Sequence, residues 1–350
     1  MDILFSIIGL GLLVLGAEII IRGSVSFGRK INISLFAIGV VIVAGGTSLP
    51  ELASSINAVL NDFSDLALGA VVGSNIANLI LVMATTTLIF PIVNINKNQI
   101  NQAWINIILG IVLIIMTFFY FNFIFGLVAT TSLIYLMYVQ IKKGEIDNLE
   151  IDKNDYSITI SLILIIIGIA CLVFGADLLV DSAINIARTY NVPASVIGLS
   201  LVAFGTSLPE LAVGIVSAFR KKIDFALGNI LGSNIYNVLG VLGISSFFGN
   251  FKVPAVLANQ DLYFMLSITA LILMFMIFVK KIGRIYGIIG LAAILSIFEG
   301  NNWIYYIWLL ASVSVIYSIF SVIRNYELFS SYIISLAPSV IVLFLSLIHI

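Results

Sequence analysis

Two glutamates, Glu51 and Glu210, stand inside long apolar stretches of this chain. Each directly follows a proline, in GGTSLPE at residues 45–51 and in FGTSLPE at residues 204–210. Each also lies 10 or 11 residues before the next charged residue, which is ~15–16 Å along a helix and close to half of a hydrocarbon core. A charge at that depth costs ~3 kcal/mol or more, so the pair indicates an ion-binding site. The alternative is a protonated pair that only packs helices.

The two prolines belong to the same candidate site. Pro50 and Pro209 have no backbone N–H, so the carbonyls of Gly46 and Gly205 lose their helical partners. A carbonyl freed inside a membrane must find another partner, and a cation is one candidate. The alternative is that both prolines only kink their helices.

Hydroxyl and amide side chains recur at helical spacing around the glutamates. Thr47 and Glu51 are four residues apart and therefore share one face of a helix. The same spacing joins Ser74 with Asn78, Thr206 with Glu210, and Ser233 with Asn237. Oxygen ligands of these types suit Ca²⁺, Na⁺ or Mg²⁺, and the reluctance of Mg²⁺ to lose its water favours Ca²⁺. Alternatively, the serines and the nearby glycines serve only close helix packing.

The charge of the two glutamates predicts exchange. Two carboxylates balance one Ca²⁺, two Na⁺ or two protons. A buried site of this kind is costly when empty and neutral when it is loaded with any of these sets. The sequence therefore favours a site that trades one set for another.

The composition is that of an integral membrane protein. Of 350 residues, 61% are hydrophobic and 9% are charged, with a mean hydropathy of +1.20, whereas soluble domains carry about 25% charged residues. The net charge of −1 gives no support for nucleic-acid binding. No phosphate-binding loop of the GxxxxGK[ST] type occurs, so we expect no ATP-driven pump. The single cysteine, Cys171, cannot form an internal disulfide.

The apolar runs predict ten core helices. They are expected at residues 3–21, 33–60, 66–93, 103–120, 123–141, 158–180, 194–219, 225–248, 262–279 and 285–298. With the N-terminus outside and a further helix at residues 303–323, alternating sides place fourteen of the sixteen Lys and Arg residues in the cytoplasm and leave Arg188 and Lys252 outside. We therefore expect an outside N-terminus and a cytoplasmic loop at residues 142–156.

The chain contains an internal repeat with an offset of 159 positions. This offset superimposes Glu51 on Glu210, and it also superimposes GSNIAN at residues 73–78 on GSNIYN at residues 232–237. Five predicted spans separate equivalent points, and an odd number reverses the direction of the second copy. Inverted repeats with interrupted helices are typical of secondary transporters. We therefore predict an all-α polytopic membrane protein with two inverted five-helix repeats.

These features divide the chain into segments. The first repeat is expected at residues 1–141, the linker at 142–156 and the second repeat at 157–298. The other segments are two further helices at 303–323 and 329–348, within an extra hydrophobic region at 299–344, and a sequencing-adapter artefact at 345–350. The one histidine, His349, lies in the last segment and receives no role.

The duplicated GTSLPE and GSNI[AY]N motifs resemble those of the calcium/cation antiporter superfamily, in particular the prokaryotic sodium/calcium exchangers. The resemblance covers about residues 1–298. It implies four cation sites near the middle of the membrane, with Ca²⁺ and Na⁺ as transported substrates and with no cofactor. It places the ligands at Thr47, Ser48, Glu51, Ser74, Asn78, Thr206, Ser207, Glu210, Ser233 and Asn237, and at the backbone oxygens of Ala44 and Ala203.

The resemblance also implies a mechanism and a location. The first and sixth helices would slide as a gating pair during alternating access, in the inner membrane of a prokaryotic cell. Glu18 and Asp177 lie on these helices, where we expect them to reach interfacial water. Some relatives carry Asp where this chain has Asn237, so the number of Na⁺ ions stays open. The expected partners are the transported ions and the lipid bilayer, without a soluble partner.

Three other functions compete with Na⁺/Ca²⁺ antiport. A Ca²⁺/H⁺ antiporter would use Glu51 and Glu210 as proton carriers, and it ranks second because that branch shows a different motif. A cation channel is disfavoured by the inverted repeat. An intramembrane hydrolase would need a nucleophile with a paired base, which the sequence does not offer, so we expect no enzyme.

Overall fold

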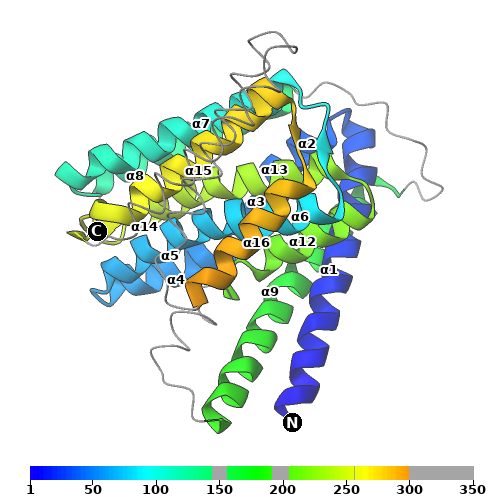
Figure 1. The fold of residues 1–350 in the computed structure, drawn as a ribbon, viewed down its shortest axis with the longest axis horizontal. Coiled ribbons are helices and arrows are strands. Elements are labelled where there is room, and N and C mark those ends of the chain that lie inside the picture. Colours follow the sequence, from blue (N-terminus) through cyan, green and yellow to red (C-terminus); the bar gives the residue numbers. More distant parts are fainter. Residues whose placement is uncertain (144–155, 191–204, 256, 299–350) are drawn as a thin grey trace, which may run out of the picture.

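The structure is a computed structural model that describes residues 1–143, 156–190, 205–255 and 257–298. Among these residues, seven helices are long and apolar enough to cross a membrane, or eight if one bent pair is counted as a single span. The predicted class, an all-α polytopic membrane protein, is confirmed (Figure 1). The extra helices expected after residue 298, most of the loop 142–156 and the segment 345–350 lie outside the described residues.

Within the described residues the helices follow the predicted spans, whereas the first part of the predicted span 194–219 lies outside them. The first half holds α1 (Asp2–Ile31), α2 (Leu35–Ile38), η1 (Gly39–Val43), α3 (Ala44–Thr47), α4 (Leu49–Leu60), α5 (Ser64–Ala77), η2 (Asn78–Val82), α6 (Met83–Ile89), β1 (Ile92–Val93), α7 (Lys97–Ile115), η3 (Met116–Phe118) and α8 (Phe123–Lys143). The second half holds α9 (Ile158–Thr189), α12 (Leu208–Phe219), α13 (Ile223–Ile235), η5 (Tyr236–Leu242), α14 (Gly243–Ser245), η6 (Leu257–Asp261), α15 (Leu262–Met274), η7 (Phe275–Val279), β2 (Lys281–Ile282) and α16 (Arg284–Phe298).

Two helices are longer than predicted. The expected spans 3–21 and 158–180 correspond to α1 and α9, which continue to Ile31 and Thr189. A charged residue ends an apolar run but does not break a helix. The break in α1 comes only at Asn32, which adopts a left-handed conformation with φ 56°.

The predicted span 33–60 is not one straight helix. It divides into the run from α2 to α3 and the separate helix α4, which are bent by 43° relative to each other. Ser48 lies at the break, and Pro50 lies in the first turn of α4, where a missing N–H costs nothing. In the second half α12 begins in the same way after Ser207. Both glutamates therefore occupy the first turn of a helix.

The two helices that follow the glutamates contain wider turns. The helix α5 passes into the π-helical segment η2 at Asn78, and α13 passes into η5 at Tyr236. π-Helical turns inside α-helices occur frequently at functional sites because they change which side chains face a neighbour. In both halves a motif asparagine lies at this transition.

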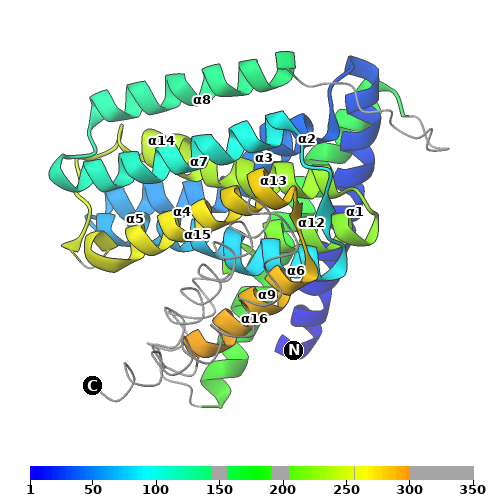
Figure 2. The ribbon, with the colours of Figure 1, turned by 45° about the horizontal axis from the view of Figure 1, so that its top comes forward.

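The helices α1 and α9 lie side by side and extend together from the main bundle (Figures 1 and 2). Glycines make the contact close. A Cβ atom added at Gly16 would lie 2.9 Å from the Gly168 carbonyl oxygen, and one added at Gly9 would lie 2.8 Å from the Gly175 carbonyl oxygen. Small residues at these positions let the two backbones approach each other directly.

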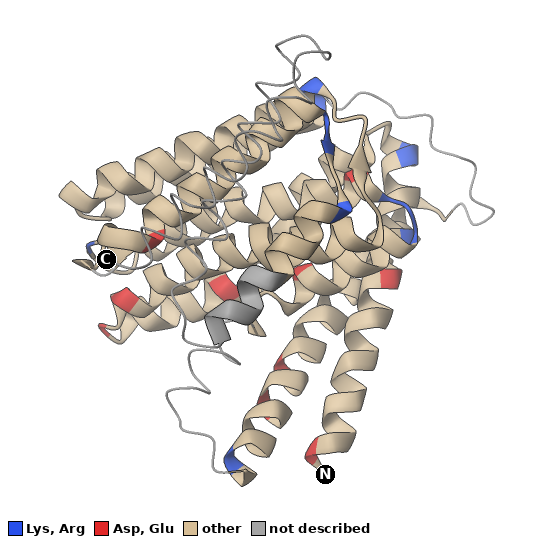
Figure 3. Cartoon of the chain, viewed as in Figure 1, with Lys and Arg blue, Asp and Glu red and all other residues tan. Residues whose placement is uncertain are grey.

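Most of the basic residues lie at one end of the molecule (Figure 3). This end includes the end of α1, the start of α7 and the two-stranded sheet, in which β1 and β2 pair in antiparallel register with Val93 opposite Lys281. The clustering agrees with the predicted separation of charges along the chain.

Candidate cation site

The two broken helices bring both glutamates into the centre of the bundle. Glu51 in α4 and Glu210 in α12 are each 0% exposed, and their carboxyl groups are near enough to interact electrostatically. A buried pair of like charges is unstable unless cations or protons compensate it. Among the described residues there is no group of three or more His, Cys, Asp and Glu side chains, so neutral oxygens must complete any cation site.

Hydroxyl groups from both halves surround the carboxyl groups. The Ser74 hydroxyl donates to Glu51 Oε1 at 3.2 Å, and the Ser233 hydroxyl donates to Glu210 Oε1 at 3.4 Å. The equivalent threonines contact the carboxyl group of the opposite half. The Thr206 side chain hydrogen-bonds to Glu51, and the Thr47 side chain hydrogen-bonds to Glu210. Each carboxyl group therefore has a serine from its own half and a threonine from the other half.

Further hydroxyl contacts join the two halves. Ser74 Oγ lies 3.3 Å from Ser207 Oγ, and Thr47 Oγ1 lies 3.4 Å from Ser233 Oγ. Ser48 is buried, and its hydroxyl has no partner among the described residues. The structure thus gathers eleven of the twelve predicted site residues, Ala44 included, in one region.

Of the two predicted backbone ligands, the carbonyl groups of Ala44 and Ala203, the structure describes only that of Ala44. The Ala44 carbonyl accepts the backbone N–H of Ser48 at 3.1 Å and the Thr47 hydroxyl at 3.3 Å, so it is already engaged in this conformation. Ala203 lies outside the described residues.

The motif asparagines form a ring of amides across the two halves. Asn78 Nδ2 donates to Asn234 Oδ1 at 3.0 Å, and Asn237 Nδ2 donates to Asn75 Oδ1 at 3.0 Å. The sequence predicted Asn78 and Asn237 as site residues but missed Asn75 and Asn234. The signal was present, because both occupy the third position of the duplicated GSN motif.

The site contains an excess of oxygen atoms that can only accept hydrogen bonds. Five buried carboxylate or amide oxygens among the described residues lack a well-formed hydrogen bond, and four of them lie here. The four are Glu51 Oε2, Glu210 Oε2, Asn78 Oδ1 and Asn237 Oδ1. The fifth belongs to Gln102, which is paired with Gln140. Buried acceptors without donors are rare in proteins, and a bound ion or water molecule is one explanation for them.

Comparison with known proteins identifies the family at this point. The model of the sodium/calcium exchanger protein family matches residues 1–143 and 160–296. The chain belongs to the sodium/calcium exchanger family. The two matched segments start 159 positions apart (160 − 1), which is the offset between Glu51 and Glu210.

Several relatives agree with this membership. An uncharacterized membrane protein of Methanocaldococcus jannaschii is 35% identical over 82% of this chain and 94% of its own length. The sodium/calcium exchanger MaX1 of Methanosarcina acetivorans is 28% identical over 82% of this chain and 95% of its own. A solved structure of the sodium–calcium exchanger NCX_Mj, soaked with Na⁺ and Ca²⁺, superimposes with a TM-score of 0.75 at 34% identity, covering 85% of this chain and 97% of that one.

Membership in the sodium/calcium exchanger family defines the class of activity. The family consists of exchangers rather than enzymes, and its substrates are Ca²⁺ and Na⁺. This member is an integral membrane protein of the cation-antiporter class.

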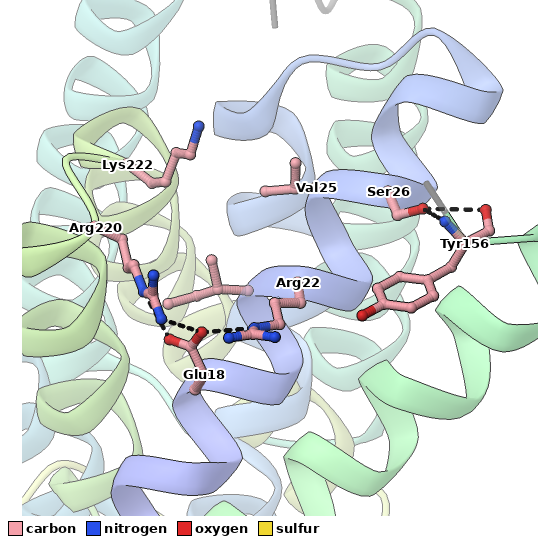
Figure 4. Close-up of a pocket in the computed structure, with 8 residues that line it drawn as sticks. Glu18, Arg22, Val25, Ser26, Tyr156, Arg220 and Lys222 are labelled. Carbon is pink, nitrogen blue, oxygen red and sulfur yellow. Dashed lines mark hydrogen bonds and ion pairs between the residues drawn. The ribbon is translucent and has the colours of Figure 1, made fainter. Parts of the chain in front are cut away.

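A second polar region of this exchanger lies at its basic end. Glu18 of α1 accepts hydrogen bonds from Arg22 Nε at 2.6 Å and from Arg220 Nε at 2.9 Å (Figure 4). These groups line a pocket of about 130 Å³ together with Lys222 and Tyr156. The sequence does not predict this ion pair, in which tertiary packing brings Arg220 from the end of α12 to the Glu18 carboxylate.

Proposed function

We propose that this protein moves Ca²⁺ out of the cell in exchange for entering Na⁺, by alternating access at the site between α4 and α12. The observation that carries the proposal is the set of four buried acceptor oxygens around two carboxyl groups. Ca²⁺ takes six to eight oxygen ligands, mostly carboxylates, amide and backbone carbonyls. Carboxylate, amide and hydroxyl groups supply that kind of ligand here.

The charge of the site supports exchange rather than simple binding. Glu51 and Glu210 together carry two negative charges, which one Ca²⁺ or two Na⁺ neutralise. The site is neutral when it is loaded and charged when it is empty. The protein therefore closes over the site and changes the side that the site faces more easily with bound cations than without them. We propose that this cost of the empty state enforces coupling between the two cation fluxes.

The ligand set proposed for these cations is the predicted one. It comprises Thr47, Ser48, Glu51, Ser74, Asn78, Thr206, Ser207, Glu210, Ser233 and Asn237, with the backbone oxygens of Ala44 and Ala203. We place the Ca²⁺ ion between the two carboxyl groups, with Na⁺ ions nearer to the hydroxyl groups. No resident cofactor is proposed.

We also propose that the two halves are inverted repeats in a prokaryotic inner membrane, with the N-terminus outside. The clustered basic residues at one end of the molecule support this orientation (Figure 3), since cytoplasmic loops carry an excess of Lys and Arg. Thiol labelling tests it. In a Cys171→Ser background, a cysteine at position 148 should react only from inside, whereas a cysteine at Lys252 should react from outside. The reverse pattern would overturn the orientation.

The decisive test of exchange is ⁴⁵Ca²⁺ uptake into proteoliposomes at clamped voltage. Vesicles would be loaded with Na⁺, with K⁺, or with acidic buffer, and protein-free vesicles serve as the control. Uptake from Na⁺-loaded vesicles alone supports the proposal. Uptake driven by a proton gradient would support the Ca²⁺/H⁺ alternative. Uptake independent of any counter-ion would indicate a channel.

A further inference from the structure

The amide ring beside the carboxyl groups contains two asparagines with no role in the proposed ligand set. Asn75 and Asn234 are each 3% exposed and lie on α5 and α13. A buried side-chain amide has two chemically opposite ends: the oxygen only accepts hydrogen bonds, whereas the nitrogen only donates them. Which end points toward a cation therefore decides whether the amide attracts or repels it.

The direction of these amides is fixed by the backbone. Asn75 Nδ2 donates to the backbone carbonyl of Asn234 at 3.5 Å, and Asn234 Nδ2 donates to the backbone carbonyl of Asn75 at 3.4 Å. A carbonyl oxygen can only accept, so it holds the nitrogen end of each amide. The oxygen ends of Asn75 and Asn234 must then point the other way.

The oxygen ends of Asn75 and Asn234 in turn orient the amides of Asn237 and Asn78. Asn75 Oδ1 accepts from Asn237 Nδ2, and Asn234 Oδ1 accepts from Asn78 Nδ2, both at 3.0 Å. The nitrogen ends of the two outer amides are thereby engaged. Their oxygens, Asn237 Oδ1 and Asn78 Oδ1, remain buried without a donor. Asn237 Nδ2 also donates to the Ser74 hydroxyl oxygen at 3.2 Å. A hydroxyl can either donate or accept, so this contact alone does not set the direction of the amide. The two backbone carbonyls therefore set the direction of two candidate ligands through two intermediate amides.

We propose that Asn75 and Asn234 are positioning residues that hold the Asn237 and Asn78 amides with their oxygens toward the cation. This inference rests on the proposed function, because it assigns the residues to that site. Without Asn75, the Asn237 amide can turn and present its NH₂ group, which repels a cation. The pairing also crosses the two halves, so each half sets the ligand of the other.

Replacement of an amide by a carboxylate separates positioning from packing. The two oxygens of an aspartate are equivalent, so an Asp at position 237 presents an oxygen in either direction. Asn75→Ala should therefore weaken Ca²⁺ binding strongly when residue 237 is Asn and only slightly when residue 237 is Asp. A packing role for Asn75 would cost the same in both backgrounds.

The experiment measures Ca²⁺ binding to the purified full chain in detergent, by calorimetry and without transport. We expect Asn75→Ala to weaken Ca²⁺ binding about tenfold, as loss of outer-sphere partners of metal sites does. In the Asn237→Asp background the same change should weaken Ca²⁺ binding by less than about threefold. Asn75→Ser, which keeps a polar group, is the alternative should the alanine variant not fold.

A crossed control uses the other pair. Asn78→Asp should not rescue Asn75→Ala, but it should rescue Asn234→Ala. Equal costs in all backgrounds would overturn the positioning role while leaving the cation site intact. Absence of Ca²⁺ binding by the unmodified chain would instead overturn the proposed function, and the two failures are therefore distinguishable.

Discussion

The two halves of the site have the same chemistry but different surroundings. Around the carboxyl groups the repeat is conservative, since Thr, Ser, Glu and Asn recur at equivalent positions. Other positions differ between the halves, and at three of them the residue of the second half bonds to the first half. At the offset of 159, Ala70 corresponds to Asn229, Ala77 corresponds to Tyr236, and Asn61 corresponds to Arg220.

Asn229, Tyr236 and Arg220 of the second half each bond to a residue of the first half. The Thr47 hydroxyl donates to Asn229 Oδ1 at 3.3 Å, and the Tyr236 hydroxyl donates to the Val41 carbonyl at 2.7 Å. The third is the ion pair between Arg220 and Glu18 (Figure 4). The second half thus supplies these additional links, while both halves supply ligands equally.

The two equivalent helices also differ in how deeply they are buried. In the helical span that carries Asn237, residues 223–245, 94% of the most apolar 18-residue stretch is buried. In the equivalent span that carries Asn78, residues 64–89, the buried share is 67%. Polar residues inside a membrane protein are tolerated where protein covers them, and there they find partners. Of the three residues, Asn229 and Tyr236 therefore belong to the more buried of the two equivalent helices, whereas Arg220 lies outside it.

The largest expected effect tests whether the two carboxyl groups are equivalent. Glu51→Gln and Glu210→Gln should each reduce Ca²⁺ exchange about 100-fold or more, because each removes half of the compensating charge from a buried site. The measurement is ⁴⁵Ca²⁺ flux in proteoliposomes, with insertion verified by protein recovery. Asp65→Asn, which alters an exposed carboxylate of α5, is the matched control and should transport normally. Strong flux in only one glutamine variant would show that the halves differ in function.

The second largest effect is expected on thermal stability, at the contact between α1 and α9. Gly168→Ala should lower the melting temperature in detergent by several degrees, because a Cβ there would meet Ile20 Cβ and backbone N at 2.8 Å. Gly9, the equivalent residue in α1, should be equally sensitive. Gly11→Ala is the control, since a Cβ there has no neighbour within 4 Å. Equal stability of all three variants would show that the glycines do not hold the helix pair together.

A smaller effect is expected at the asymmetric amide. Asn229→Ala should weaken Ca²⁺ binding about threefold to tenfold, because the Thr47 hydroxyl loses one acceptor. Position 70 of the other half is already alanine, so the variant makes the two halves more alike. Calorimetry on the purified chain measures the change, and melting without Ca²⁺ separates binding from stability. Unchanged affinity would assign Asn229 to packing.

The smallest effect is expected at the exposed ion pair. Arg220→Asn copies the residue of the first half and should destabilise the protein by about 1 kcal/mol or less, because the pair is open to solvent. Melting at low and high salt measures it. The difference from the unmodified protein should shrink as salt rises. A difference that persists at high salt would indicate that Arg220 acts through packing.

Sequence patterns alone predicted much of the fold and most of the site. The composition and the length of the apolar runs determined the membrane class, because a helix that crosses a bilayer needs about 20 consecutive apolar residues. The duplicated motifs identified Glu51 and Glu210, since a carboxylate in the middle of an apolar run is costly unless a cation or a proton neutralises it. Helical spacing placed Thr47 on the same face as Glu51, but it did not show that the Thr47 hydroxyl would lie at Glu210 of the other half.

Only the tertiary structure decided which groups pair across the halves. Ser74 lies 133 positions from Ser207, Asn75 lies 162 positions from Asn237, and Glu18 lies 202 positions from Arg220. Helical periodicity relates residues within one helix and carries no information about the neighbour that a helix will meet. The amide direction at the cation site depends on such a neighbour. The residue types are therefore written in the sequence, whereas the orientation of their oxygens is a property of the packed bundle.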